Sequence, residues 1–277
     1  MADEKKVAAL KEQAKKVRIT LLQMIHDAHS GHPGGSLSAA DLMTVLYFDE
    51  LNVKPEDPKW PDRDRFVLSK GHVCPVLYTC LGLRGYFDQS YFKTLRKEGS
   101  ILQGHPDMKR CPGIDISTGS LGQGISVATG MAIAGKRDNK DYRVFTLVGD
   151  GECDEGQVWE AAETASKYGL DNLYVFVDNN GLQNDGVCAD IMPTRDLEAK
   201  FAAFGFMTQR INGHDIGAIL DAIEIAKNDK SGRPHCIVMN TVKGKGVSFM
   251  EGVVKWHGVA PNDEELAQAI KEIQEAE

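Results

Sequence analysis

Two stretches of the chain place polar residues directly after apolar runs. Gly149-Asp150-Gly151 follows RVFTLV, and Asn180 comes soon after LYVFV. The glycines permit a tight turn and close approach to a ligand, and a helix beginning after the turn offers free N–H groups that suit phosphate. Asp150 would repel a phosphate unless a cation lay between them. Magnesium bound by the carboxylate and by diphosphate oxygens resolves this conflict.

The second stretch supplies further oxygen ligands for the same ion. The ends of neighbouring parallel strands lie about 5 Å apart, so Asp150 and Asn180 could share one hard cation. The backbone carbonyl of Leu182 is a third candidate ligand, and Ca²⁺ or Mn²⁺ could substitute for Mg²⁺. Taken alone, GDG is also consistent with a solvated turn capped by an aspartate.

Four histidines stand in glycine-rich segments: His32 in SGHPG, His72 in SKGHV, His105 in QGHPD and His257 in KWHGV. A single loop histidine is usually a surface residue. Four with an adjacent glycine indicate a set that converges on one cleft, where imidazoles can orient hydroxyls and move protons. The remaining histidines match no motif, and we assign no function to them; they are His26, His29, His214 and His235.

The elements that must position these residues alternate between strands and helices. The predicted helices cover 3–28, 36–50, 75–83, 89–96, 121–136, 155–168, 196–204, 215–226 and the last residues of the chain. The predicted strands cover 66–68, 143–148, 173–177, 205–210 and 236–240, and a long loop covers 101–120. Strands that are apolar on both faces predict an α/β fold of three layers, with a central, mostly parallel sheet flanked by helices. Ligands of such sheets gather at the carboxyl ends of the strands, where GDG, DNN and TVKGKG lie.

Composition excludes several other functions. The chain has 277 residues and a formal net charge of -8, so nucleic acid is not an expected partner. No apolar run approaches the roughly 18 residues of a membrane span, and the charged start lacks a signal-peptide core. The six cysteines are scattered without zinc or disulfide spacing. We therefore expect a cytoplasmic protein with no membrane partner and one domain over 1–277.

Eight segments in order resemble the N-terminal, diphosphate-binding domain of transketolase. They are SGHPGGSLSAADL, DRFVLSKGHVCPVLY, GHPD, STGSLGQGISVATGMA, LVGDGECDEGQVWEA, VDNNGLQNDG, TVKGKGVSFME and WHGVAP. Deoxyxylulose phosphate synthase and the pyruvate dehydrogenase E1 proteins share the GDG and N positions. They do not share the other segments in this form.

The resemblance implies thiamine diphosphate as cofactor and assigns a role to each matching residue. The metal ligands would be Asp150, Asn180 and the Leu182 carbonyl. His32, His105 and His257 would be the catalytic residues that face the sugar. The cofactor-binding residues would be Gly35, Lys70, His72, Gly119, Ser120, Leu121, Gly151, Glu155, Asn180, Lys243 and His257. Glu155 is also consistent with a glutamate that simply complements a helix dipole; the family places a glutamate here between paired active sites.

The resemblance also implies that this chain works with a partner. In the family, the glutamate that activates the cofactor belongs to a second, pyrimidine-binding domain, which has no counterpart in these 277 residues. We expect a split enzyme with a separate C-terminal subunit, assembled as two copies of each, although a truncated chain is an alternative. The expected reaction is transfer of a two-carbon ketol unit from a ketose phosphate to an aldose phosphate.

Three other functions stay open at this point. The chain could be the diphosphate-binding half of a deoxyxylulose phosphate synthase-like enzyme, or of a transketolase specialised for another sugar or a sulfosugar. It could also be a non-catalytic paralogue that keeps the fold. The intact Asp150, Asn180 and loop histidines argue against the last.

Overall fold

A five-stranded sheet forms the centre of the computed structural model, which describes residues 2–276. Its strands are β1 (Arg65–Leu68), β2 (Val144–Gly149), β3 (Leu173–Asn179), β4 (Met207–Asn212) and β5 (His235–Asn240). Their spatial order is β1-β2-β3-β5-β4, and every neighbouring pair is parallel. The predicted α/β fold is confirmed, and the sheet is parallel throughout rather than mostly so.

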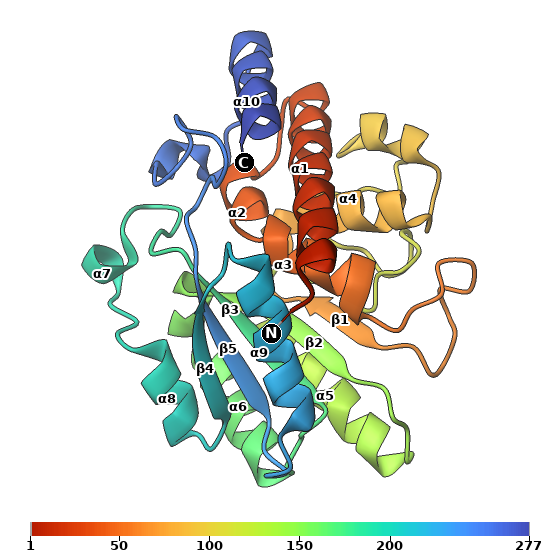
Figure 1. Ribbon diagram of the computed structural model, residues 1–277, viewed down its shortest axis with the longest axis vertical. Coiled ribbons are helices and arrows are strands. Elements are labelled where there is room, and N and C mark those ends of the chain that lie inside the picture. Colours follow the sequence, from red (N-terminus) through yellow and green to blue (C-terminus); the bar gives the residue numbers. More distant parts are fainter. Residues whose placement is uncertain (1, 277) are drawn as a thin grey trace.

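Helices cover both faces of this sheet (Figure 1). The α-helices are α1 (Glu4–Asp27), α2 (Pro33–Ser38), α3 (Ala40–Val45), α4 (Cys74–Arg84), α5 (Gln123–Arg137), α6 (Gly156–Lys167), α7 (Cys188–Ile191), α8 (Leu197–Ala203), α9 (Ile216–Asn228) and α10 (Asp263–Glu275). A π-helical turn follows α3 at Leu46–Glu50, and 3₁₀ turns lie at Gly71–Val73, Gln89–Thr94, Gly151–Asp154 and Val254–His257.

The side chains of β3 show why its sequence lacks polar alternation. Tyr174 and Phe176 pack into a core shared with α1, α3, α4 and α9. Val175 and Val177 point to the opposite face and pack with α5, α6 and α8. Because both faces are buried, apolar residues are required at successive positions, as is typical of parallel sheets.

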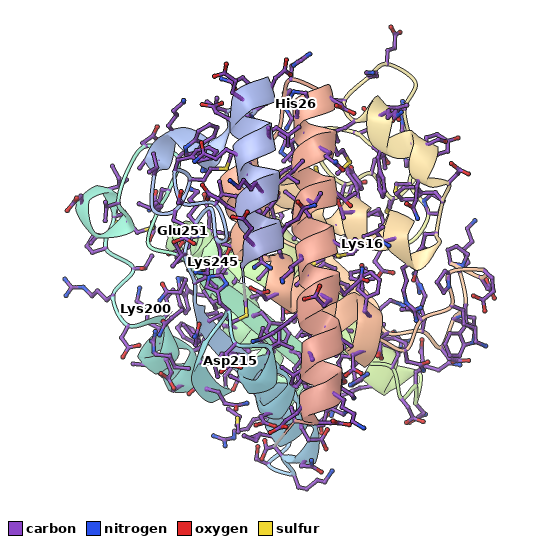
Figure 2. All side chains as sticks on the ribbon, turned by 45° about the horizontal axis from the view of Figure 1, so that its top comes forward. Lys16, His26, Lys200, Asp215, Lys245 and Glu251 are labelled. Atoms are coloured by element: carbon purple, nitrogen blue, oxygen red, sulfur yellow. The ribbon has the colours of Figure 1, made fainter. Side chains whose placement is uncertain are left out.

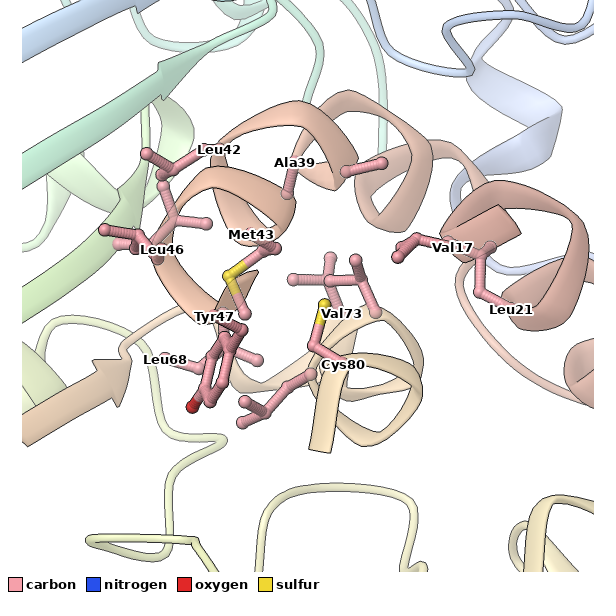
Figure 3. Close-up of a cluster of buried hydrophobic side chains, with 14 of the residues drawn as sticks. Val17, Leu21, Ala39, Leu42, Met43, Leu46, Tyr47, Leu68, Val73 and Cys80 are labelled. Carbon is pink, nitrogen blue, oxygen red and sulfur yellow. The ribbon is translucent and has the colours of Figure 1, made fainter. Parts of the chain in front are cut away.

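The larger core joins the N-terminal helices to the sheet. Figure 3 shows Val17 of α1, Met43 of α3 and Cys80 of α4 directed into one apolar cluster. Their side chains are fully buried there. All six cysteines are buried and unpaired, so the prediction of free thiols is confirmed.

The start of the second helix differs from the prediction. The predicted helix over 36–50 begins in the structure with α2 at Pro33, so Ser36 and Ser38, which have the chemistry of helix caps, lie inside the helix. Proline is favoured at the first helical position because its φ is already helical and it has no N–H to satisfy. This frees the Ser38 hydroxyl, which donates to Asp178 at 2.5 Å.

Other boundaries shift where glycine adopts a left-handed conformation. Helix α5 begins at Gln123 rather than at 121, because Gly122 before it has φ 78°. A 3₁₀ turn separates GDG from α6, which begins at Gly156. Strand β4 begins two residues later than predicted, after Gly205 with φ 91°. The predicted helix at 89–96 is a 3₁₀ turn.

Helix α10 lies beside α1 (Figure 2). A capping box between Asn262 and Glu265 begins α10, and Asp263 lies 2.8 Å from Nε2 of His26 at the end of α1. Across residues 2–276, no helix combines the length and the apolar character that a membrane span requires.

Candidate cofactor site

The carboxyl ends of β2, β3 and β5 meet at one edge of the sheet. Gly149 pairs in register with Asp178, and Asn179 pairs with Asn240. A cavity of about 320 Å³ lies at this edge, within the size range of small-molecule sites. The sequence segments GDG, DNN and TVKGKG therefore come together as parallel strand ends should.

Asp150 joins the first two of these segments. Its side chain is only 2% exposed. The carboxylate accepts hydrogen bonds from the backbone N–H of Gly151 at 2.8 Å and of Gly181 at 2.5 Å. Burial, and then the charge of nearby Asp178, raise the pKa of Asp150. A cation bound at this carboxylate would offset both effects.

The predicted metal ligands form a set of hard oxygen donors. Asn180 and Leu182 line the same cavity as Asp150, and the Asn180 side-chain oxygen accepts from the Leu182 N–H at 3.1 Å. In the described chain, no group of three or more His, Cys, Asp or Glu side chains could hold a metal. A single carboxylate with neutral oxygens suits Mg²⁺, which commonly takes its remaining ligands from phosphates and water.

Lys70 and Asp178 form a buried ion pair behind the cavity. Lys70 Nζ donates to the Asp178 carboxylate, and both side chains are almost fully buried. The hydroxyls of Ser38 and Thr241 also donate to Asp178. Burial alone would raise the pKa of Asp178, but the Lys70 ammonium and the three donated hydrogen bonds lower it. Asp178 thus stays ionised and holds Lys70 at the cavity wall.

Lys243 differs from Lys70 because no carboxylate in residues 2–276 forms an ion pair with it. Its ammonium donates to the carbonyls of Leu182 at 3.1 Å and Gln183 at 3.3 Å, and to Nδ1 of His257 at 2.8 Å. Burial, and then the charge of Lys70, lower the pKa of Lys243 to about 8. A buried cation that forms no direct ion pair is well suited to an anionic ligand.

Three of the four loop histidines form a cluster. The ring centroids of His32 and His72 are 5.2 Å apart, those of His72 and His257 are also 5.2 Å apart, and those of His32 and His257 are 5.4 Å apart. Burial, with nearby cationic groups, lowers the pKa of His32 to about 4 and that of His257 to about 3. The pKa of His72 lies well below its usual value for the same reasons. These imidazoles are therefore neutral near pH 7.

His105 lies close to this cluster but is more exposed. Its ring packs against Gly119, where a Cβ atom would lie 2.9 Å from Cδ2 of His105. Gly119 has φ 149°, which side chains rarely adopt, so a glycine is required at this turn. The loop that carries His105 is held by Tyr78, whose hydroxyl donates to the His105 carbonyl at 2.9 Å.

The structure brings most of the predicted site residues to the cavity. Those that line it are Gly35, Lys70, His72, Gly119, Leu121, Asp150, Gly151, Asn180, Leu182, Lys243 and His257. His32 is placed beside the cavity by its contacts with His72 and His257. Ser120 and Glu155 are exposed and do not line the cavity. Glu155 lies against Gly122, since a Cβ atom added to Gly122 would be 2.8 Å from the Cβ atom of Glu155.

Glu152 is a site residue that the sequence reasoning missed. It lines the cavity, and its buried carboxylate accepts from Ser69 Oγ at 2.5 Å and from the N–H groups of Gly122 and Gly149 at 3.0 Å each. One side chain thus ties three cavity loops together. The available signal was an acidic residue directly after GDG, two positions from Asp150, the predicted metal ligand.

His214, one of the histidines without a motif, has a structural role. Its Nε2 accepts from the Val242 N–H at 2.8 Å, and its Nδ1 lies 2.9 Å from Asp41. Burial alone would raise the pKa of Asp41, but Arg18 and His214 lower it to about 2. Arg18 also donates to the Lys245 carbonyl at 3.3 Å. The group therefore braces the backbone around TVKGKG from outside the cavity.

Comparison with known proteins agrees with this geometry. The family model described as "Transketolase, thiamine diphosphate binding domain" matches residues 9–274. The chain is 45% identical to a 6-deoxy-6-sulfo-D-fructose transketolase subunit of Clostridium sp. strain MSTE9, over 96% of both chains. It is 40% identical to an apulose-4-phosphate transketolase subunit of Phocaeicola vulgatus, over 97% of this chain and 95% of that protein.

Larger transketolases match over part of their length. The chain is 41% identical to human transketolase over 98% of its own residues, and it spans 43% of the human protein. The crystal structure of transketolase from Campylobacter jejuni superimposes with a TM-score of 0.91 at 35% identity, covering 99% of this chain and 43% of that one. This chain belongs to the family of transketolase thiamine diphosphate-binding domains.

Proposed function

We propose that this chain is the diphosphate- and metal-binding subunit of a two-subunit transketolase. The observation that carries the proposal is its full-length match to transketolase subunits, combined with a cavity lined by oxygen donors, two lysines and neutral histidines. Bound thiamine diphosphate would serve as the electron sink for transfer of a two-carbon ketol unit. The predicted cytoplasmic location and assembly of two copies of each subunit belong to the same proposal.

Residues of this chain have distinct parts in that function. Asp150, Asn180 and the Leu182 carbonyl would hold Mg²⁺, and Lys243 and Lys70 would contribute positive charge for the diphosphate. The Leu182 carbonyl accepts from Lys243 in this structure, so metal binding there would release Lys243 toward the anion. His32, His105 and His257 face the sugar and hydrogen-bond its oxygens. The activating glutamate and the residues that bind the far end of the sugar come from the C-terminal subunit.

The proposed substrate is more specific than the ketose phosphate that the sequence led us to expect. Relatives that match over almost their whole length include subunits named for 6-deoxy-6-sulfo-D-fructose and for apulose 4-phosphate. We therefore favour a specialised ketose that ends in a sulfonate or a phosphate. This is the alternative that the sequence left open.

Reconstitution tests the proposal. The chain is purified alone and with a transketolase C-terminal subunit from the same organism, then supplied with thiamine diphosphate and Mg²⁺. Ketol transfer to an aldose phosphate is measured with 6-deoxy-6-sulfo-D-fructose, apulose 4-phosphate, xylulose 5-phosphate and fructose 6-phosphate. We expect transfer only with both chains, and most rapidly from one of the first two donors. Robust transfer by the chain alone would refute the two-subunit proposal.

Calorimetry separates an enzyme subunit from a non-catalytic paralogue. We expect thiamine diphosphate to bind in a Mg²⁺-dependent manner in the presence of the C-terminal subunit. Asp150→Ala should abolish the dependence on metal. Metal-dependent binding that survives Asp150→Ala would contradict the assigned ligand, and the absence of binding under every condition would favour the paralogue.

A further inference from the structure

Arg96 lies beside the histidine cluster in an unfavourable backbone conformation. Its φ is 60°, a left-handed value that costs a residue other than glycine about 1–2 kcal/mol. The backbone N–H donates to the Leu102 carbonyl at 2.8 Å, which holds this turn. The side chain extends back toward α2, so the strained turn is what aims the guanidinium at the cluster. Such strain is commonly retained where a side chain must be placed for function.

The guanidinium of Arg96 is not there to form an ion pair. Its hydrogen-bond partners are Ser30 Oγ at 2.8 Å, His32 Nδ1 at 3.3 Å and the Gly104 carbonyl at 3.5 Å. Among residues 2–276, none of the partners of Arg96 is a carboxylate, and its Nε is buried without a partner. Several other arginines of the chain are paired with a carboxylate, as Arg18 is with Asp41 and Arg63 is with Asp115.

The contact with His32 decides where the imidazole carries its proton. An arginine side chain has only N–H donors and stays protonated, so His32 Nδ1 must be the acceptor. A neutral imidazole has one donor and one acceptor nitrogen, and His32 is neutral near pH 7. The proton of His32 must therefore reside on Nε2.

The Nε2 side of the His32 ring faces Gly258 and the ring of His257. A Cβ atom built on Gly258 would lie 3.8 Å from His32 Nε2, which is an ordinary van der Waals distance. With glycine at position 258, no side chain covers this nitrogen from that direction.

We infer that Arg96 is a positioning residue that holds His32 as the Nε2–H tautomer, so that His32 presents a hydrogen-bond donor to the sugar. This rests on the proposed function for the identity of the ligand only. His32 then stabilises a carbonyl or hydroxyl oxygen of the substrate and does not act as a base. Proton acceptance in the cleft is left to other groups.

The tautomer can be measured without substrate or partner. The full chain is labelled with ¹⁵N-histidine, and long-range ¹H–¹⁵N correlation spectra at pH 7 distinguish protonated from unprotonated ring nitrogens. The spectrum of His32→Gln assigns the His32 signals. His214 is an internal control of opposite sense, because Val242 donates to its Nε2 and its proton must lie on Nδ1. We expect Nε2–H for His32 and Nδ1–H for His214.

Variants of Arg96 test the cause. Arg96→Met removes every donor and should convert His32 to a mixture of tautomers, whereas Arg96→Lys keeps a donor and should retain Nε2–H. Arg84→Met, at an exposed arginine of α4, should change neither signal. If Arg96→Met does not fold, Arg96→Gln is used in its place, and the wild-type spectrum still decides which nitrogen of His32 carries the proton.

Two results would overturn the inference: a wild-type His32 with its proton on Nδ1 or averaged between both nitrogens, or a folded Arg96→Met chain that keeps Nε2–H. Neither result depends on ketol transfer. Failure of this inference is therefore distinguishable from failure of the proposed function.

Discussion

The two ends of the central sheet use buried charge in different ways. At the amino end, Arg143 donates to the carboxylates of Glu50 and Asp64, and Lys227 lies 3.3 Å from Glu50. Every charge in this group has a partner of opposite sign. The group therefore serves the fold, because it closes the start of β1 and β2 without leaving an unpaired ion in a poorly solvated place.

At the carboxyl end, the charges are only partly compensated by one another. Lys70 is paired with Asp178, but Lys243 donates to carbonyls and an imidazole, and Asp150 accepts from backbone N–H groups. Unpaired buried charge is costly to the folded chain. Incomplete neutralisation thus marks the end of the sheet that is suited to an ionic ligand.

Asp178→Asn should have the largest effect on the free energy of unfolding. The substitution leaves Lys70 buried without a counter-charge and should lower the free energy of unfolding by about 4 kcal/mol. Because Lys70 lines the cavity, bound diphosphate can replace the lost carboxylate. We therefore expect thiamine diphosphate with Mg²⁺ to stabilise this variant more than it stabilises the wild type. Urea denaturation with and without the ligands measures both quantities.

Arg143→Met is the matched change at the amino end. It leaves two carboxylates without their main partner and should lower the free energy of unfolding by about 3 kcal/mol. The proposed cofactor site lies at the other end of the sheet, so thiamine diphosphate with Mg²⁺ should stabilise this variant only as much as the wild type. If the ligands stabilised Arg143→Met and Asp178→Asn equally, beyond their effect on the wild type, the two ends of the sheet would not differ in this respect.

Lys243→Met should separate binding from stability. Loss of the ammonium should weaken thiamine diphosphate binding by about 30-fold, or roughly 2 kcal/mol. The free energy of unfolding should stay the same or rise, because the buried ammonium has no carboxylate partner within residues 2–276. Calorimetry and urea denaturation are compared with Lys245→Met, which removes a half-exposed lysine paired with Glu251 (Figure 2). A marked loss of stability in Lys243→Met would show that its carbonyl contacts serve the fold.

The smallest expected effect is the loss of folding stability at low pH. The pKa is lowered to about 4 for His32 and about 3 for His257, whereas an unfolded histidine titrates near 6.5. Below pH 6.5 the unfolded chain binds protons that the folded chain does not, so the free energy of unfolding must fall as the pH drops toward 4. The full pKa shifts would give a loss of about 2 kcal/mol per histidine by pH 5. Solvent screening of these partly exposed rings should reduce it to about 1 kcal/mol. Urea denaturation at pH 7, 6 and 5 should show a smaller loss in His32→Gln, and an identical loss would contradict the assignment.

Much of this protein was determined by sequence alone. The apolar runs that became β2, β3 and β5 were located to within two residues, because burial on both faces leaves a continuous hydrophobic signal. Asp150 and Asn180 were predicted to lie together because strand ends of a parallel sheet converge. Most of the other predicted cavity residues came from the resemblance to transketolase. Local composition also explains the long loop at 101–120, which has no helix or strand in the structure.

Local patterns failed where a distant residue competes for a group. Ser38 has the chemistry of a helix cap, yet its hydroxyl donates to Asp178, which lies 140 positions away. Glu152 resembles an ordinary acidic residue at a helix start, but its buried carboxylate accepts hydrogen bonds from Ser69 and Gly122 and so links two other loops. Such roles depend on partners that come from other loops, and spacing along the chain does not encode them.

The sequence by itself therefore determined the fold class, the chemistry of the candidate metal ligands and the set of histidines. Only the tertiary structure decided which charges neutralise one another, which nitrogen of His32 accepts from Arg96 and which glutamate ties the loops together. The physical reason is the range of the interactions. Hydrophobic periodicity and turn chemistry act over a few residues, whereas ion pairs, burial and hydrogen-bond direction are properties of groups that meet only after the sheet has formed.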